Sequence, residues 1–121
     1  MHSYKNQNPS FEKRRKDCAK VLEKFPDKVP VVCEIKEDSD LPSMEKNMFL
    51  LPTAMTAAEF NYIIRKRMKL DETKCLYIFV KSKYLLKADS VMAEVYALRK
   101  DLDGYLYVTI AEESTTGSQI C

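Results

Sequence analysis

The order of helical and strand patterns along the chain constrains its fold more than any other feature. The first pattern is helical: between residues 10 and 25, apolar side chains recur with the spacing of one buried helical stripe. Pro26 ends this helix, because the residue before a proline is disfavoured in the α region. Residues 29–35 and 48–51 then have strand patterns that we expect to pair antiparallel. Pro30 predicts an edge position for the first of these strands, because proline has no N–H for a sheet ladder.

The clearest helix start lies near the middle of the chain. Thr56 and Glu59 form a capping box, in which each side chain accepts a hydrogen bond from the other residue's backbone N–H. The helix that begins there carries an apolar stripe as far as Met68. Residues 76–80 follow as a nearly continuous apolar run, which is typical of a central strand.

The last third of the chain adds one helix and one strand. Residues 84–86 are expected to lie in a loop, and Asp89 and Ser90 are candidate caps for the helix. An Asp103-Gly104 turn precedes the final strand, residues 105–110. The complete order is helix, then β-β-α-β-α-β. It predicts the α+β class and a ubiquitin-like β-grasp, with a four-stranded mixed sheet and an N-terminal helical extension.

The chain of 121 residues is long enough for one domain with its own core. We expect an N-terminal segment at residues 1–10, a ubiquitin-like domain with its helix at 11–111, and a flexible tail at 112–121. Residues 1–30 carry eight Lys or Arg and four Asp or Glu, whereas residues 31–60 carry two and six. This distribution predicts a basic face and an acidic edge, and the modest net charge of +2 argues against nucleic-acid binding.

Catalytic and metal chemistry have little support in the sequence. The four cysteines show no Cys-x-x-Cys spacing, and the single histidine, His2, is near the end of the chain, so no zinc site is expected. No histidine neighbours a candidate nucleophile, so the chain is not expected to be an enzyme. Without an apolar run of membrane-spanning length or a signal peptide, the chain is predicted to be reduced and cytoplasmic.

Several motifs together resemble one family. The chain is similar to the autophagy ubiquitin-like modifiers, the GABARAP and light-chain-3 group, from about Tyr4 to Gly117. The motifs that carry the resemblance are Phe11-Glu12-Lys13-Arg14-Arg15, Phe25-Pro26-Asp27-Lys28-Val29-Pro30-Val31, Phe49-Leu50-Leu51-Pro52, Ile64-Arg65-Lys66-Arg67 and Asp103-Gly104-Tyr105-Leu106-Tyr107-Val108-Thr109.

The resemblance implies a modifier that is attached to lipid. A processing cysteine protease would cleave between Gly117 and Ser118, and ubiquitin-like activating and conjugating enzymes would join Gly117 to phosphatidylethanolamine. The expected location is the cytoplasm, and the autophagosome membrane after lipidation. No other cofactor is implied. Glycine at this position suits an extended tail in a narrow enzyme cleft.

The resemblance also implies a docking site for aromatic-x-x-aliphatic motifs of cargo receptors and adaptors, which add a strand beside residues 48–51. The implied pocket for the aromatic side chain consists of Asp17, Val21, Pro30, Val32, Leu50 and Tyr105. The second pocket consists of Phe49, Leu51, Pro52, Met55, Phe60, Ile63 and Ile64, although Phe60 and Ile64 fit the core equally well. Lys46 and Arg67 would meet acidic residues of the peptide, and Met48 completes the edge.

Three departures from the family pattern bear on these expectations. Met48 stands where a lysine is common, Thr116 precedes Gly117 where an aromatic residue is usual, and residues 84–86 replace a proline-containing loop. Two other functions remain open. One is an unconjugated adaptor that binds tubulin or trafficking proteins through its basic first helix. The other is a tag attached to protein lysines.

Overall fold

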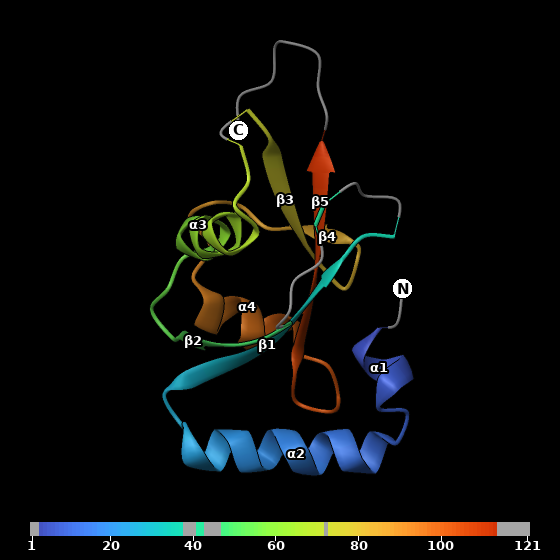
Figure 1. The fold of residues 1–121 in the computed structure, drawn as a ribbon. Coiled ribbons are helices and arrows are strands. Elements are labelled where there is room, and N and C mark those ends of the chain that lie inside the picture. The colour runs from blue at the N-terminus through green and yellow to red at the C-terminus, as the bar shows by residue number, and fades with distance from the viewer. Residues whose placement is uncertain (1–2, 38–40, 43–46, 72, 114–121) are drawn as a thin grey trace.

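A five-stranded sheet organises the molecule, with strand order β2-β1-β5-β3-β4 (Figure 1). The computed structural model describes residues 3–37, 41–42, 47–71 and 73–113. The strands are β1 (Lys28–Ile35), β2 (Met48–Pro52), β3 (Cys75–Val80), β4 (Tyr84–Leu85) and β5 (Leu106–Glu113), and the helices are α1 (Tyr4–Gln7), α2 (Phe11–Lys24), α3 (Ala57–Met68) and α4 (Met92–Arg99).

The pairing confirms the predicted mixed sheet. β1 is antiparallel to β2 and parallel to β5, and β5 is antiparallel to β3. The parallel pair joins the first strand to the last, as in a ubiquitin-like β-grasp. The N-terminal helical extension is also present as α1 and α2.

The predicted number of strands was wrong, because residues 84–85 pair with β3 instead of lying in a loop. The turn before β4 has Lys81 and Ser82 in the left-handed region, with φ of 55° and 57°, and the Lys83 N–H donates to the Val80 carbonyl. Positive φ at both central residues is typical of hairpin turns and usually calls for Asn or Gly. Because neither occurs here, the sequence carries no hairpin signal.

The position of Pro30 was also predicted wrongly, since β1 lies between β2 and β5. Lys36 donates its N–H to the Ile110 carbonyl on the β5 side, and alternation places the Pro30 nitrogen on that same side. The register of β1 with β5 begins only at Val31 opposite Leu106. Pro30 therefore precedes the ladder and removes no hydrogen bond from it.

Helices cover both faces of the sheet, and the sheet separates two apolar clusters. On one face, α3 and α4 pack on alternate residues of the strands, including Val31, Phe49 and Val108, to form the main core. On the other face, Cys18 of α2 packs with Val32, Tyr105 and Tyr107. We call this second group the α2-side cluster.

Of the two helix caps predicted from the sequence, the one at Thr56 is confirmed and the one at Asp89 and Ser90 is wrong. The Ser10 hydroxyl accepts from the Lys13 N–H, and the Thr56 capping box is complete. α4 instead begins after Val91 without a side-chain cap. The Asp89 and Ser90 side chains are not needed, because the Met92 and Ala93 N–H groups donate to the carbonyls of residues 55 and 53.

The ends of the domain differ slightly from the expected boundaries. Residues 4–7 form α1 within the expected N-terminal segment, and β5 continues to Glu113, two residues beyond the expected boundary at 111. The remainder of the expected tail, including Gly117 and Ser118, lies outside the described residues.

Candidate functional site

The open edge of β2 is the first component of the candidate site. β2 is the terminal strand of the sheet. The Cys33 N–H donates to the Asn47 carbonyl, so alternation directs the backbone of Phe49 and Leu51 toward β1 and that of Met48 and Leu50 outward. An outward-facing strand backbone is the structural requirement for pairing with an added peptide strand.

All six residues predicted for the aromatic pocket lie on the α2 side of the sheet. Pro30 is opposite Leu50 in the register and Val32 is opposite Met48, so these four side chains share one face. Val32 and Tyr105 are buried, whereas Leu50, Met48, Asp17 and Val21 are half-buried. Three elements, α2, β1 and β2, thus meet around an apolar surface that is only partly covered.

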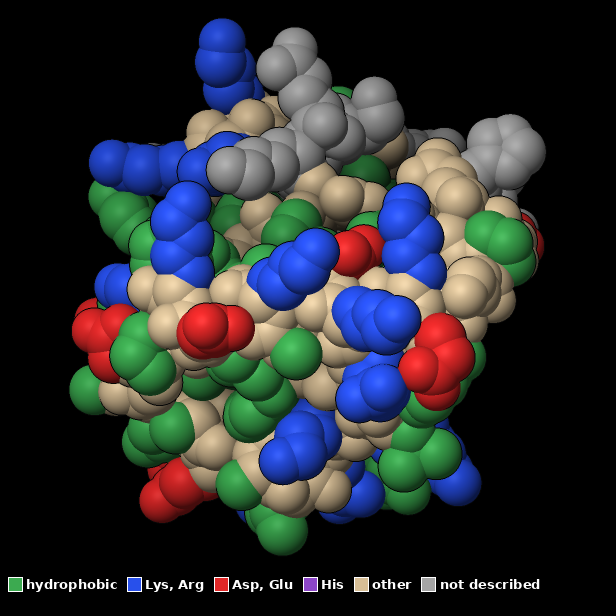
Figure 2. Space-filling view, turned by 90° about the horizontal axis from the view of Figure 1, so that it is seen from below, with side chains coloured by type: hydrophobic (Ala, Val, Ile, Leu, Met, Phe, Trp, Pro, Cys, Tyr) green, Lys and Arg blue, Asp and Glu red, His purple; other side chains and the backbone are tan. Residues whose placement is uncertain are grey.

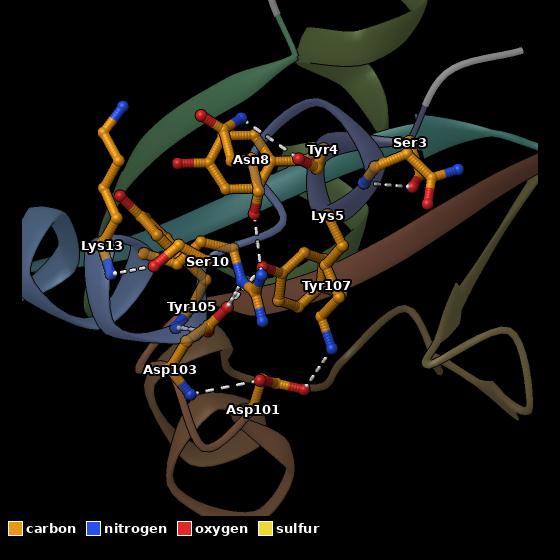
Figure 3. A network of polar contacts seen from close by, with 12 residues as sticks. Ser3, Tyr4, Lys5, Asn8, Ser10, Lys13, Asp101, Asp103, Tyr105 and Tyr107 are labelled. Carbon is orange, nitrogen blue, oxygen red and sulfur yellow. Dashed lines mark hydrogen bonds and ion pairs between the residues drawn. The ribbon is translucent and has the colours of Figure 1, made fainter.

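The α1 helix supports this surface from a side that sequence reasoning missed. The Tyr4 ring meets the Tyr105 ring edge-on, with centroids 5.5 Å apart (Figure 3). The Tyr4 N–H donates to Glu34 Oε2 at 2.7 Å. Lys5 pairs with Asp101 at 2.9 Å. The only feature of the sequence that indicated the packing of α1 on the sheet was one aromatic residue, Tyr4, in an otherwise polar segment.

A buried ion pair fixes the turn that presents Tyr105. Asp103 Oδ2 accepts from Arg14 Nε at 2.9 Å and from the Tyr107 hydroxyl at 2.6 Å, and Asp103 Oδ1 accepts from the Tyr105 N–H (Figure 3). The hydrogen bond to Asp103 raises the pKa of Arg14, and burial, followed by the Asp103 contact, raises the pKa of Tyr107. This network joins α2 to the start of β5.

The residues predicted for the second pocket divide into core and surface. Phe49, Leu51, Phe60 and Ile64 are buried in the main core. Met55 and Ile63 are half-buried against that core, and Pro52 is exposed. In this conformation Pro52, Met55 and Ile63 therefore form the surface between β2 and α3. The four buried residues of the predicted pocket lie beneath that surface.

Basic side chains flank the candidate site. Arg67 is exposed, with Cζ 5.2 Å above the Phe49 ring, so its charge lies beside the second pocket. Lys46 lies outside the described residues. On the α2 side, Lys and Arg side chains gather across the surface in Figure 2, and exposed α2 residues Lys13, Arg15, Lys16, Lys20 and Lys24 contribute to it.

A separate hollow of about 620 Å³ lies between α3 and the β3–β4 hairpin. Its lining includes Ala58, Asn61, Tyr62 and Leu85, and contains no residue predicted for the docking site. The hollow and the β2 edge are on opposite sides of the sheet order.

The described part of the chain contains neither a candidate metal centre nor a candidate membrane span. No three His, Cys, Asp or Glu side chains there lie together as a metal site would require. None of the described helices has the length and hydropathy of a membrane span.

Comparisons with known proteins agree with this architecture. Residues 13–117 match the family described as "Autophagy protein Atg8 ubiquitin like". The chain is 43% identical to autophagy-related protein 8 of Candida glabrata, over 97% of this chain and 98% of that protein. It is 39% identical to autophagy-related protein 8d of Arabidopsis thaliana, over 97% and 96%. The crystal structure of Trypanosoma brucei ATG8 superposes with a TM-score of 0.85 and 33% identity, covering 97% of this chain and all of that one.

Proposed function

The chain belongs to the Atg8 family of autophagy ubiquitin-like proteins, and on that premise we propose that it is a lipid-conjugated docking protein for aromatic-x-x-aliphatic motifs. The open β2 edge, with apolar surface on either side of it, carries the docking half of this proposal. Its expected partners are cargo receptors and adaptors of autophagy. The conjugating half assigns Gly117 as the attachment point for phosphatidylethanolamine.

An added peptide strand would pair with the outward backbone of Met48 and Leu50. Side chains two positions apart on a strand point to the same face, whereas those three apart point to opposite faces. An aromatic residue and an aliphatic residue three positions later therefore reach opposite sides of β2. The α2 side offers Leu50 with Val21, and the α3 side offers Met55 and Ile63. The exposed Arg67 side chain, beside Phe49, would attract an acidic residue near the aliphatic end.

A peptide titration tests the docking site. We expect Leu50→Ala and Arg67→Ala each to weaken binding of an aromatic-x-x-aliphatic peptide by about 1–2 kcal/mol, as for modest interface anchors. Lys66→Ala is the matched control, because Lys66 is the neighbouring cation on α3 and its Nζ lies 4.9 Å from the Tyr62 ring instead of facing Phe49. If Arg67→Ala and Lys66→Ala bind the peptide with equal affinity, Arg67 is not part of the docking site.

The family match supports conjugation at Gly117, because the matched segment ends at that residue. The described part of the chain ends at Glu113, so three residues, 114–116, connect β5 to the proposed attachment point, which is four Cα–Cα steps from Glu113. An extended segment of this length reaches about 13 Å, enough to enter an enzyme cleft. A phosphatidylethanolamine amide would then hold the domain at the autophagosome membrane, since two acyl chains give stable anchoring.

Intact-mass spectrometry of the protein from starved cells tests conjugation. We expect loss of residues 118–121 together with the added mass of a phospholipid. Gly117→Ala should remain unconjugated while it keeps the same peptide affinity. Recovery of only the full-length chain, from soluble and membrane fractions alike, would support the adaptor that acts without conjugation. A second protein whose mass is increased by that of the trimmed chain would support the tag attached to lysines.

A further inference from the structure

The end of α4 and the turn after it expose two leucines that the proposed docking site does not use. Leu98 is 81% exposed in the last turn of α4, and Leu102 is 88% exposed in the turn formed by residues 101–104. We call Leu98, Arg99, Lys100 and Leu102 the leucine corner. Side chains as exposed as these two leucines project from a convex surface, so the corner is not a groove that holds a peptide.

The turn that carries Leu102 is held firmly. The Gly104 N–H donates to the Asp101 carbonyl, and the Asp101 N–H donates to the Tyr105 carbonyl at 2.7 Å. The Tyr96 hydroxyl donates to the Gly104 carbonyl at 2.6 Å, which ties the turn back to α4. Leu102 is therefore presented by an ordered backbone, and its insertion elsewhere would cost little conformational entropy.

Positive charge surrounds the two leucines. Arg99 and Lys100 lie between them in the chain, and the Arg99 Cζ is 3.7 Å from the centroid of the Tyr84 ring. Lys83 lies 5.5 Å from the same ring, so a second basic element borders the corner.

The nearby acids offset little of this charge. Asp101 is paired with Lys5, and Asp103 is buried against Arg14. Glu94, one turn before Leu98, is the exposed acid on this side of α4. The turn also lies at the α2 end of the molecule, the end with the basic surface (Figures 1 and 2). A partner of the leucine corner should therefore have a negatively charged surface, which attracts the Lys and Arg side chains, and an apolar layer below that surface, which accepts the leucines.

An anionic bilayer has this combination of properties. Leucine side chains gain free energy in the acyl boundary, while Lys and Arg remain among the negative headgroups. We propose that the leucine corner inserts into the surface of an anionic membrane. This contact is independent of the proposed lipid anchor, because β5, about 26 Å long by its eight residues, separates the corner from the segment that leads to Gly117.

A tryptophan reporter tests the insertion directly, since the chain contains no tryptophan. The full unconjugated chain carrying Leu102→Trp is mixed with phosphatidylcholine vesicles, with or without about 30% phosphatidylserine. Emission should shift to shorter wavelength only with the anionic vesicles and return as salt is raised. Tyr62→Trp, at a 59% exposed site on α3, is the matched reporter and should not shift. An unchanged Leu102→Trp spectrum would overturn the proposal.

Vesicle co-sedimentation supplies the second measurement. Leu98→Ser and Leu102→Ser should each lower partitioning about tenfold, the factor for losing burial of most of one leucine side chain. Tyr62→Ser should bind like the unchanged chain, and because all three sites are exposed, the fold is not at risk. Equal binding by Leu102→Ser and Tyr62→Ser would overturn the proposal. Concentration-dependent dimers that Leu102→Ser abolishes, without vesicle binding, would assign the corner to a second copy of the chain instead.

Discussion

Replacing Arg14 by methionine tests the buried ion pair that fixes the start of β5. The Arg14 and Asp103 side chains are 8% and 0% exposed, so the substitution leaves a buried carboxylate without its counter-charge. Two neutral donors, the Tyr107 hydroxyl and the Tyr105 N–H, remain on Asp103. Breaking a buried pair in this way costs about 3–5 kcal/mol. For a domain whose free energy of unfolding is typically about 5–15 kcal/mol, this is a large fraction.

Urea unfolding followed by circular dichroism measures this loss. Lys5→Ala is the matched control, because the Lys5–Asp101 pair has the same distance of 2.9 Å but its side chains are 44% and 21% exposed. An exposed pair contributes about 0–1 kcal/mol. Tyr107→Phe should fall between the two, at about 1.5–3 kcal/mol, because it removes one hydrogen bond to a charged acceptor.

The same substitution should also weaken peptide docking. Arg14 Nη1 donates to the Asn8 carbonyl at 2.7 Å, so its loss loosens α1 as well as the turn before Tyr105. We expect Arg14→Met to lower peptide affinity at a temperature where the variant is still folded. If Arg14→Met and Lys5→Ala destabilise the protein equally, or if both lose less than about 1 kcal/mol, burial is not what makes the Arg14 pair important.

Two further predictions concern the turn and the thiol beside it. Gly104 has φ of +99°, and a Cβ there would lie 2.8 Å from Cys18 Sγ. Gly104→Ala should therefore lower the free energy of unfolding, measured by urea titration, by about 1–3 kcal/mol. The double variant Gly104→Ala, Cys18→Ala should regain part of the lost stability. Burial raises the pKa of Cys18 from 9.0 to about 11. The contribution of this pKa shift to stability is therefore complete below pH 9 and declines between pH 9 and 11, by about 1.4 kcal/mol per pH unit. Cys18→Ala should therefore reduce the decrease of the unfolding temperature between pH 9 and 11. If the unfolding temperature of Cys18→Ala decreases as steeply as that of the unchanged protein, the thiol is not responsible.

Local signals in the sequence predicted the parts of the fold that local physics determines. Ser10 and Thr56 begin helices as expected, because a hydroxyl that accepts from an N–H three residues later acts within one turn. The resemblance, and not a local signal, grouped Val32 with Leu50, and the register of β1 with β2 puts both side chains on the α2 face of the sheet. For Phe60 and Ile64 the sequence left core and pocket equally open, and both are buried in the main core.

The features that were predicted wrongly depend on distant contacts or on uncommon backbone. Pro30 is tolerated inside the sheet because of where β5 begins to pair, which no neighbour of Pro30 in sequence reveals. α4 begins without a side-chain cap because carbonyls of the segment before α3 accept its first N–H groups. The β4 turn uses Lys81 and Ser82 at positive φ, residues that rarely mark such turns. The packing of Tyr4 against Tyr105 was not predicted at all, because the two residues lie far apart in the sequence and no periodic pattern links them.

The parallel pairing of β1 with β5 has a consequence for the order in which the protein folds. Val31 finds its partner Leu106 only 75 positions later in the chain. During synthesis the β1–β2 hairpin is complete long before β5 exists, so one edge of β1 stays open and exposed to other chains. Non-local parallel pairing is also slow to form. β2, the strand that carries the docking edge, is thus synthesised early. Its partner β1 becomes paired on both sides only when β5, the last strand, has been synthesised.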